Sequence, residues 1–451
     1  MRGEVMWPRL VASKLLRKTL GSNNFVADFP GNTYSFLDLQ TLDLEPVQNP
    51  EIILSNHNHD TQKFKVFVST WNVGGVTPTD DLNIDDLLDT CNISCDIYVL
   101  GFQEVVPLRA SNVLGSEKKK VSMKWNSLIR KTLNKKSHSR CYKNDNLNEK
   151  QHRVTKGKKS NIESSINRPE FRCLISKQMV GIMISVWVRS DLHPFFRNPS
   201  VSCIGCGIMG CLGNKGSVSV RFQFHETSFC FICSHLASGG REGDERTRNS
   251  NAAEILSRTS FPTVMGPSLD LPKKILDHDR VVLLGDLNYR ISLPERDTRL
   301  LVNRKDWNTL LENDQLRMEL MDGQAFEAWH EGTITFAPTY KYHPSCDEYF
   351  LGSKGKKKRA PAWCDRIIWT GEGLKQLLYT RIEARLSDHR PVKAIFSSEV
   401  KVSRMKYQSF CLSERFGHRT KTNLDFHSDD DEYSSHSGRL SFHVRNKRTT
   451  P

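Results

Sequence analysis

The segment Arg280-Val-Val-Leu-Leu-Gly-Asp-Leu-Asn-Tyr-Arg290 joins a strand-length apolar run to two polar side chains. Asp286 and Asn288 follow the apolar run two residues apart, directly after a glycine. In an extended chain, residues i and i+2 point to the same side, so we expect the carboxylate and the amide to project together. A carboxylate at the end of a buried strand needs a cation, a partner or a proton to transfer, because burying it alone is costly. The segment therefore predicts a functional site, although a strand that runs into an ordinary polar turn has the same pattern.

Short runs of this kind recur from Lys63 onward, with helix-length polar and apolar segments between them. Strands interleaved with helices indicate an α/β or α+β domain. The expected helices are 81–90, 246–258 and 307–320. The expected strands are 64–70, 97–100, 180–188, 217–224, 228–233, 281–284, 366–369 and 392–396.

Three stretches lack this alternation of strand-like and helix-like segments, and they set the expected domain limits. Residues 1–62 are predicted to form an irregular N-terminal leader. Residues 109–169 are rich in Lys, Asn and Ser, which predicts a largely disordered basic insertion. Residues 399–451 are rich in Ser, His and Arg and are predicted to form a disordered C-terminal tail. One folded domain, 63–398, remains.

The charge of the chain restricts its partners without choosing among them. A formal net charge of +14 favours polyanions such as nucleic acids, acidic lipid headgroups or phosphorylated small molecules, although a basic surface without a specific ligand has the same composition. No apolar run approaches the ~18–20 residues that span a bilayer. The 12 cysteines are scattered, several of them within apolar runs, as expected for reduced thiols. We therefore expect a cytoplasmic protein.

Polar side chains also mark the ends of five other expected strands. Ordinary turns after core strands would more often supply Gly, Pro, Ser or Lys. Six such strand ends in one chain indicate one shared site. The residues at these ends are Asn72, Glu104, His235, Asp286 with Asn288, Asp365, and Asp388 with His389.

These residue types suit metal-assisted hydrolysis of a phosphoester. Mg²⁺ prefers oxygen ligands, usually one or two carboxylates plus waters and substrate phosphate. Glu104 fits that role, with Asn72 as a neutral oxygen donor beside it. Attack on phosphorus needs an activated water. Asp286 can orient or deprotonate that water, with Asn288 fixing it.

Two histidines complete the predicted chemistry. His235 and His389 can hydrogen-bond the phosphoryl oxygens. A histidine must be held in one tautomer to do so, and a carboxylate on its other nitrogen serves that purpose. Asp365 is the candidate carboxylate.

Eight motifs in order carry a resemblance to a known family. The set resembles the inositol polyphosphate 5-phosphatases of the endonuclease/exonuclease/phosphatase superfamily, and the phrasing of 171–189 and 203–215 is similar to the plant branch. The resemblance covers residues 64–398 apart from the basic insertion. The motifs are Thr70-Trp-Asn-Val-Gly-Gly75, Gly101-Phe-Gln-Glu-Val105, Gly213-Asn-Lys-Gly216, Cys233-Ser-His-Leu236, Gly285-Asp-Leu-Asn-Tyr-Arg-Ile291, Pro338-Thr-Tyr-Lys-Tyr342, Pro361-Ala-Trp-Cys-Asp-Arg366 and Ser387-Asp-His-Arg-Pro-Val392.

The resemblance implies a fold, an activity and site roles. The implied fold is a four-layer α/β/β/α sandwich of two mixed β-sheets flanked by helices, as in deoxyribonuclease. The implied activity is Mg²⁺-dependent removal of the 5-phosphate from inositol phosphates or phosphoinositide headgroups, by a catalytic domain at 63–398. Carried over residue by residue, it assigns metal binding to Glu104, Asn72 and Asp388, and catalysis to His235, Asp286, Asn288, Asp365 and His389.

Substrate recognition is expected to rest on cations, since Lys and Arg bind phosphates. By resemblance, Tyr340, Lys341, Lys357 and Arg359 match the positions at which the family binds the neighbouring 4-phosphate. The basic run 354–359 could instead serve as a nuclear-localisation signal. The full set of expected substrate-binding residues is Asn214, Lys215, Tyr340, Lys341, Lys357, Arg359 and Arg366.

Two other functions fit parts of the sequence. A nuclease of the same superfamily would suit the positive charge, but it would not need the Pro-Thr-Tyr-Lys-Tyr and Pro-Ala-Trp-Cys-Asp-Arg motifs. A non-catalytic headgroup-binding protein would not need the complete catalytic set. We therefore expect a monomeric phosphatase that does not bind nucleic acid and that contacts anionic membranes peripherally through its basic insertion.

Overall fold

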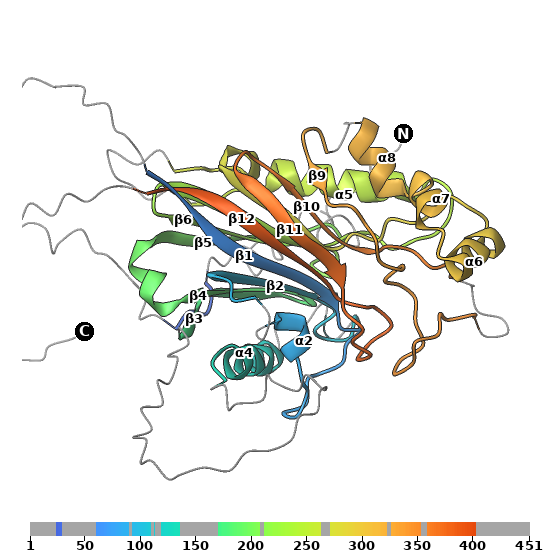
Figure 1. Ribbon diagram of the computed structural model, residues 1–451, viewed down its shortest axis with the longest axis horizontal. Helices are drawn as coiled ribbons and strands as arrows, with labels where there is room; N and C mark the ends of the chain where they lie inside the picture. The colour runs from blue at the N-terminus through green and yellow to red at the C-terminus, as the bar shows by residue number, and fades with distance from the viewer. Residues whose placement is uncertain are drawn as a thin grey trace, which may run out of the picture. The chain divides into compact units, whose positions relative to one another are not determined.

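Two mixed β-sheets pack face to face and form the centre of the protein (Figure 1). The computed structural model describes residues 24–28, 60–89, 93–109, 112, 119–135, 170–207, 212–262, 271–322, 326–352 and 359–402. The sandwich of two mixed sheets with helices on the outside confirms the expected fold class. Within these residues, no helix is both long and apolar enough to cross a membrane.

The first sheet has six strands in the order β11-β12-β1-β2-β4-β3. Strands β1 and β2 are parallel, and the other neighbours are antiparallel. The strands are β1 (Asp60–Asn72), β2 (Ile97–Gln103), β3 (Phe171–Met179), β4 (Ile182–Arg189), β11 (Leu374–Arg381) and β12 (Val392–Val402).

The second sheet repeats this plan in the order β5-β6-β7-β8-β10-β9. Its one parallel pair is β7 with β8. The strands are β5 (Phe196–Gly205), β6 (Gly216–Phe224), β7 (Thr227–His235), β8 (Arg280–Asp286), β9 (His330–Glu331) and β10 (Asp365–Thr370).

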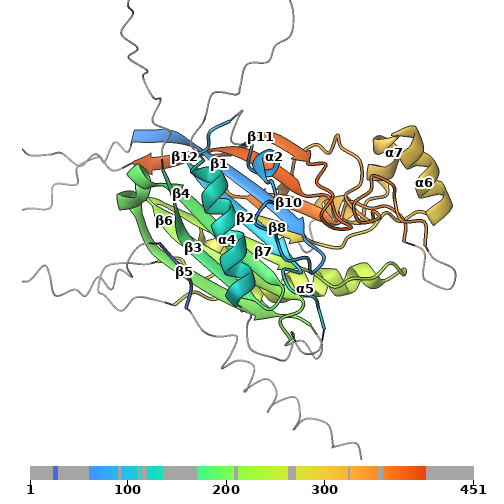
Figure 2. The same ribbon diagram turned by 90° about the horizontal axis from the view of Figure 1, so that it is seen from below.

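Alternation along the strands separates the core into three apolar layers. In β1, Val66 and Val68 face the other sheet, whereas Phe67 and Trp71 face outward. The outer face of the first sheet is covered by α2 (Asp85–Leu88) and α4 (Lys119–Leu133). The outer face of the second sheet is covered by α5 (Asp244–Arg258) and α8 (Gln315–Asp322), which gives four layers (Figure 1). Seen from below, α4 lies across the strands of the first sheet (Figure 2).

Strand direction brings the functional residues to one end of the sandwich. The carboxyl ends of β1, β2, β7 and β8 lie at this end, because each sheet contributes one parallel pair. Strands β10 and β12 run antiparallel to β8 and β1, so their first residues lie at the same end. All six strand ends singled out in the sequence therefore belong to one edge.

Each of the eight predicted strand segments overlaps a strand of the structure, but four strands were missed. β3, β5, β9 and β11 carry polar or charged residues within the strand, which weakened the apolar signal. The helix predicted at 307–320 is two helices, α7 (Trp307–Glu312) and α8, because the chain breaks between them. Helix α6 (Glu295–Arg304) was not predicted, since only Thr298 and Val302 are buried on it.

The prediction of a largely disordered insertion at 109–169 is wrong for residues 119–133, which form α4. The helix buries one apolar stripe against the first sheet and turns its lysines outward. Trp125 packs against Trp71 and Phe102, with ring centroids 6.1 and 4.6 Å apart. Low overall hydrophobicity concealed this stripe, because a helix needs only one apolar face. Residues 136–169 lie outside the described part of the chain.

The predicted domain ends also shift. Strand β1 begins at Asp60, and β12 continues to Val402, past the expected tail boundary at 398. In the leader, Val26 pairs with Ser176 at the free edge of β3, with backbone hydrogen bonds of 2.9 and 2.8 Å. Apart from residues 24–28, the predicted leader before Asp60 lies outside the described residues, as do residues 403–451.

The packing of α4 can be tested by truncating its central side chain. We expect Trp125→Ala to lower the free energy of unfolding by about 3–5 kcal/mol, because a fully buried indole leaves a cavity. Urea denaturation followed by circular dichroism measures this loss. Met123→Ala, on the same helix but 63% exposed, should change stability by less than about 0.5 kcal/mol. Equal unfolding midpoints for both variants would show that α4 does not pack as described.

Candidate active site

Asp286, the last residue of β8, lies at the centre of the candidate site. Its parallel neighbour in β7 is His235, and its antiparallel neighbour in β10 is Asp365. Since directly paired residues face the same side of a sheet, all three side chains point between the two sheets. The register of the second sheet thus fixes three of the predicted catalytic residues.

The first sheet supplies the other side of the site. Asn72, the last residue of β1, donates its side-chain N–H to Asp286 Oδ2 at 2.9 Å. The same Oδ2 lies 3.2 Å from His235 Nε2 and 3.9 Å from His389 Nε2. Glu104 follows β2, and its Oε1 lies 3.5 Å from Asn72 Nδ2. A single carboxylate oxygen therefore connects the ends of both sheets.

The charge state of Asp286 follows from these neighbours. Burial by itself would raise the pKa of this carboxyl, since only 2% of the residue is exposed. His235, His389 and Lys215 outweigh that effect and hold the pKa of Asp286 below its usual range. The carboxylate is therefore ionised at neutral pH and accepts hydrogen bonds.

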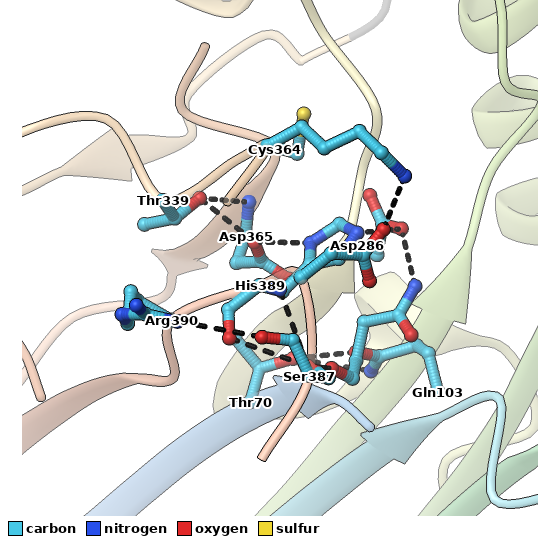
Figure 3. A network of polar contacts seen from close by, with 12 residues as sticks. Thr70, Gln103, Asp286, Thr339, Cys364, Asp365, Ser387, His389 and Arg390 are labelled. Atoms are coloured by element: carbon cyan, nitrogen blue, oxygen red, sulfur yellow. Dashed lines mark hydrogen bonds and ion pairs between the residues drawn. The ribbon is translucent and has the colours of Figure 1, made fainter. Parts of the chain in front are cut away.

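His389 is held by a carboxylate in the way the sequence predicted (Figure 3). Its Nδ1 lies 2.8 Å from Asp365 Oδ2, which also accepts a hydrogen bond from Thr339 Oγ1 at 2.7 Å. With Nδ1 on the carboxylate, Nε2 faces Asp286. The backbone N–H of His389 is in turn bound to Ser387 Oγ at 3.2 Å.

This pairing makes His389 a cation. Burial lowers its pKa, but Asp365 and Asp286 more than compensate and raise the pKa of His389 to about 9. Burial also raises the pKa of Asp365, whose Oδ1 has no hydrogen-bond partner among the described residues. With Nδ1–H bound to Asp365, the imidazolium still has Nε2–H to donate to a phosphoryl oxygen or to Asp286.

Lys215 reaches the same centre from the Gly-rich turn before β6. Its Nζ is in short contact with His235 Nε2. Burial lowers the pKa of Lys215, and burial with the Lys215 charge lowers the pKa of His235. A cation in this place can contact an anionic substrate, in line with the predicted role. Asn214, its neighbour, has a buried side-chain oxygen without a partner in the described chain.

Asn288 is in the site, but it does not project beside Asp286 as an extended chain would require. The strand ends at Asp286, and Asn288 has a φ of +58°, in the left-handed region. Its backbone N–H binds Asp286 Oδ1 at 3.2 Å. Its side chain bonds the Leu236 carbonyl at 3.1 Å and Arg290 Nη2 at 2.6 Å. Asn288 therefore orients the carboxylate of Asp286 through its backbone.

Oxygen donors suited to a hard divalent cation gather on the Glu104 side. Glu104 is partly exposed, and the contacts to its carboxylate given by the described residues are long, 3.5 Å from Asn72 and 3.9 Å from His235. A carboxylate that makes only long contacts to its neighbours is available to a cation. Asp286, Asp365 and His389 also lie close enough to hold an ion. Asp365 Oδ2 and His389 Nδ1 are committed to each other, and a protonated imidazole has no lone pair to offer a metal, so we favour the Glu104 side.

A cavity of about 620 Å³ opens beside this centre. Tyr340, Lys341 and Arg359, all predicted substrate residues, line it together with Asp388. Lys341 Nζ pairs with Asp388 Oδ2 at 2.5 Å, so this carboxylate faces the cavity rather than Glu104. The metal role predicted for Asp388 stays a prediction. The Tyr340 ring packs against His389 in a tilted arrangement, with ring centroids 4.6 Å apart, and joins the cavity to the candidate catalytic centre.

The prediction that Arg366 binds substrate is wrong. The residue follows Asp365 in β10, so it faces the opposite side of the sheet. Its guanidinium is fully buried, 2.8 Å from Asp314 and paired also with Glu331. Burial with two carboxylates gives Arg366 a structural role. Lys357 lies outside the described residues.

Several positioning residues were missed although they lie within the quoted motifs. Gln103 donates to Thr70 Oγ1 at 3.1 Å (Figure 3). It also donates to Cys233 Sγ at 3.3 Å, which links the two sheets below the site. Ser387 donates to the Asn72 carbonyl at 2.6 Å, and Thr339 fixes Asp365. The available signal was a polar residue adjacent to a predicted site residue.

Comparisons with known proteins agree with this geometry. The family model for the endonuclease/exonuclease/phosphatase family 2 matches residues 69–395. The Arabidopsis thaliana type IV inositol polyphosphate 5-phosphatase 9 is 63% identical, with 92% of this chain and 97% of that protein covered. The type I inositol polyphosphate 5-phosphatase 8 of the same plant is 41% identical, with 89% and 87% covered.

A solved structure shares both the fold and the sequence pattern. It is the inositol polyphosphate 5-phosphatase domain of SPsynaptojanin, in complex with inositol (1,4)-bisphosphate and a calcium ion. The TM-score is 0.61 at 30% identity, and the match covers 76% of this chain and 87% of that one. The chain belongs to the endonuclease/exonuclease/phosphatase family and, within it, to the inositol polyphosphate 5-phosphatases.

Proposed function

We propose that this protein hydrolyses the 5-phosphate of inositol polyphosphates and phosphoinositide headgroups in a Mg²⁺-dependent reaction. Candidate substrates are inositol 1,4,5-trisphosphate, inositol 1,3,4,5-tetrakisphosphate and phosphatidylinositol 4,5-bisphosphate, so the reaction would terminate phosphoinositide signals. The observation that carries the proposal is the ionised Asp286, surrounded by Asn72, His235 and His389 beside a cavity lined with cations.

The attacking water is the part of the reaction assigned to Asp286. A carboxylate with a lowered pKa is a weak base, but a good hydrogen-bond acceptor for aligning a water. When the water oxygen bonds to phosphorus, the bond from phosphorus to the ring oxygen breaks. Asp286 receives the proton that the water loses, and the ring oxygen leaves as a hydroxyl after it takes up a proton from solvent. Asn72 and the backbone of Asn288 hold the two carboxylate oxygens in place during this step.

The cationic side chains are assigned the stabilisation of the negative charge on the phosphoryl group. His389, held by Asp365, presents Nε2–H toward the centre, and Lys215 presents its ammonium beside His235. Fixed donors in a site that excludes water stabilise charge more than the same donors in solution. A Mg²⁺ ion at Glu104 and Asn72, when bound, would neutralise phosphate charge and polarise the phosphorus–oxygen bond.

The bound ligand of the related structure supports the choice of substrate. Inositol (1,4)-bisphosphate is what remains when inositol 1,4,5-trisphosphate loses its 5-phosphate, and it is bound by the SPsynaptojanin domain. In this chain, the cavity next to Asp286 offers Lys341 and Arg359 to a neighbouring phosphate. Peripheral membrane contact and a cytoplasmic location stay predictions.

A direct assay tests the proposal. Purified protein would be incubated with Mg²⁺ or EDTA and with soluble inositol phosphates, short-chain phosphoinositides or supercoiled DNA. We expect Mg²⁺-dependent phosphate release from 5-phosphorylated inositols alone. Nicking of the DNA without phosphate release would favour the nuclease alternative, and headgroup binding without turnover would favour a non-catalytic protein.

Asp286 should be essential to turnover. We expect Asp286→Asn to reduce kcat by a factor of about 10²–10⁴, because an amide cannot take the proton of the water. His235→Ala should also reduce kcat. Asp297→Asn, which removes an exposed carboxylate from α6, is the matched control and should leave kcat unchanged. Full activity in Asp286→Asn would remove this residue from the mechanism.

Lys341 should distinguish substrates by their 4-phosphate. Losing one charge-assisted hydrogen bond costs about 1.5–3 kcal/mol, so Lys341→Ala should lower kcat/KM about ten- to a hundredfold on substrates with a 4-phosphate. Substrates without that group should be affected much less. Lys375→Ala, an exposed lysine of β11, provides the control. Equal losses on both kinds of substrate would refute the role of Lys341 as a reader.

The charge of His389 should depend on its carboxylate partner. In EDTA-treated protein, Asp365→Asn should lower the pKa of His389 from about 9, because the imidazolium loses its main stabilising charge while burial still opposes it. Titration of the imidazole signals by NMR measures this change. His225, in the turn between β6 and β7, should titrate as in the unaltered protein. An unchanged His389 pKa would mean that the pair is not formed.

A further inference from the structure

We propose that Arg299 of α6, a residue outside all the motifs, positions the two cations that read the substrate's second phosphate. The inference rests on the proposed function, because it gives Arg299 the task of setting the distance between Lys341 and Arg359. Arg299 does not line the cavity. It is therefore a positioning residue rather than a catalytic one.

One wall of the cavity is a small hairpin, residues 341–350. Its two sides are joined by the bridge between Tyr342 and Tyr349, and Phe350 N–H donates to the Lys341 carbonyl at 2.8 Å. Near its turn, Asp347 pairs with Arg385. The hairpin carries Lys341 at its base, so the placement of Lys341 depends on what holds Phe350.

Arg299 links the base of this hairpin to the opposite rim of the cavity, where Arg359 lies. Its Nη2 donates to the Phe350 carbonyl and to the Arg359 carbonyl, each at 2.8 Å. Its Nε is fixed by Glu295 Oε1 at 2.6 Å, one turn earlier on α6. The Arg299 side chain is only 17% exposed, so water competes weakly for these bonds. A single guanidinium thus joins α6 to both sides of the cavity.

The spacing of the two cations follows from this link. Phe350 is hydrogen-bonded to Lys341, and Arg359 itself lines the cavity, so each carbonyl bound by Arg299 belongs to or adjoins one phosphate reader. Without Arg299, both carbonyls would turn to water and the two rims could move independently. Two donors that bind one phosphate need a fixed separation, because ordering them at binding costs affinity.

The geometry of the guanidinium distinguishes it from an ammonium. Arg presents several N–H groups in one rigid plane, and this arrangement serves two carbonyls and a carboxylate together. A lysine at the same position has a single nitrogen at the end of a flexible chain. Arg299→Lys should therefore keep the positive charge but hold only part of the link.

Steady-state kinetics on two soluble substrates provides the test. For Arg299→Gln we expect KM for inositol 1,4,5-trisphosphate to rise about tenfold, which corresponds to the loss of one charge-assisted hydrogen bond. The value of kcat should stay within about twofold, because Asp286 and its neighbours are untouched. KM for inositol 1,5-bisphosphate, which lacks the 4-phosphate, should not change. Arg299→Lys should lie between the two forms.

Arg304→Gln is the matched control, because it removes the same charge from an exposed position of the same helix. Its kinetics should equal those of the unaltered protein. A rise in KM that is equal for both substrates, or equal in Arg304→Gln, would overturn the inference. If Arg299→Gln does not fold, Arg299→Lys with a normal melting temperature carries the same comparison.

A binding measurement separates this inference from the proposed function. Calorimetric titration of metal-free protein with inositol 1,4-bisphosphate measures the affinity of the cavity for this ligand without catalysis. About tenfold weaker binding to Arg299→Gln supports the positioning role even if no phosphate is released from any substrate. Equal affinities of the unaltered protein and of Arg299→Gln refute the positioning role of Arg299, even if the enzyme is an active 5-phosphatase.

Discussion

The site depends on one buried carboxylate that receives hydrogen bonds from both sheets. Asp286 is 2% exposed, and an ionised group at such a position persists only when it is surrounded by donors and cations. Asn72 of β1 donates a hydrogen bond, and the imidazoles of His235 from β7 and His389 before β12 lie 3.2 and 3.9 Å away. The two sheets must therefore stay in register with each other to within the length of a hydrogen bond. The catalytic arrangement and the stability of this end of the sandwich rest on the same contacts.

Close approach of the sheets is what lets Asn72 reach Asp286, and it depends on a glycine. A Cβ at Gly101, in the middle of β2, would lie 2.6 Å from Leu284 Cδ1 and 2.9 Å from Cys233 Sγ. Any larger residue would force β2 away from β7 and β8. Gln103, two residues further on the same face, bonds Cys233 across the remaining gap. Packing in the core thus sets the distance across which the site works.

The sequence was informative where burial and chemistry coincide. Apolar runs that ended in Asp286, His235 or Asn72 located both strands and candidate site residues, because polar side chains recur at six strand ends of one chain. Strands such as β11 and the helix α4 were missed or misassigned because their apolar residues are spread over one face among charged ones. The conformation of Asn288 was also unpredictable from spacing, since a left-handed residue ends the extended chain. Hydrogen bonds between distant segments, such as that from Arg299 to the Phe350 carbonyl, leave no pattern in the local sequence.

Neighbouring residues of one motif can serve opposite purposes, and β10 shows why. Asp365 and Arg366 are adjacent in the strand, so the alternation of side chains sends one into the site and the other to the outer face. Asp365 meets His389 between the sheets, whereas Arg366 meets Asp314 and Glu331 on the outside. Removing one partner of such a buried ion pair costs about 3–5 kcal/mol, because the other charge remains buried. A motif in a strand of the candidate site therefore combines a residue that faces the site with a residue that keeps the strand in place.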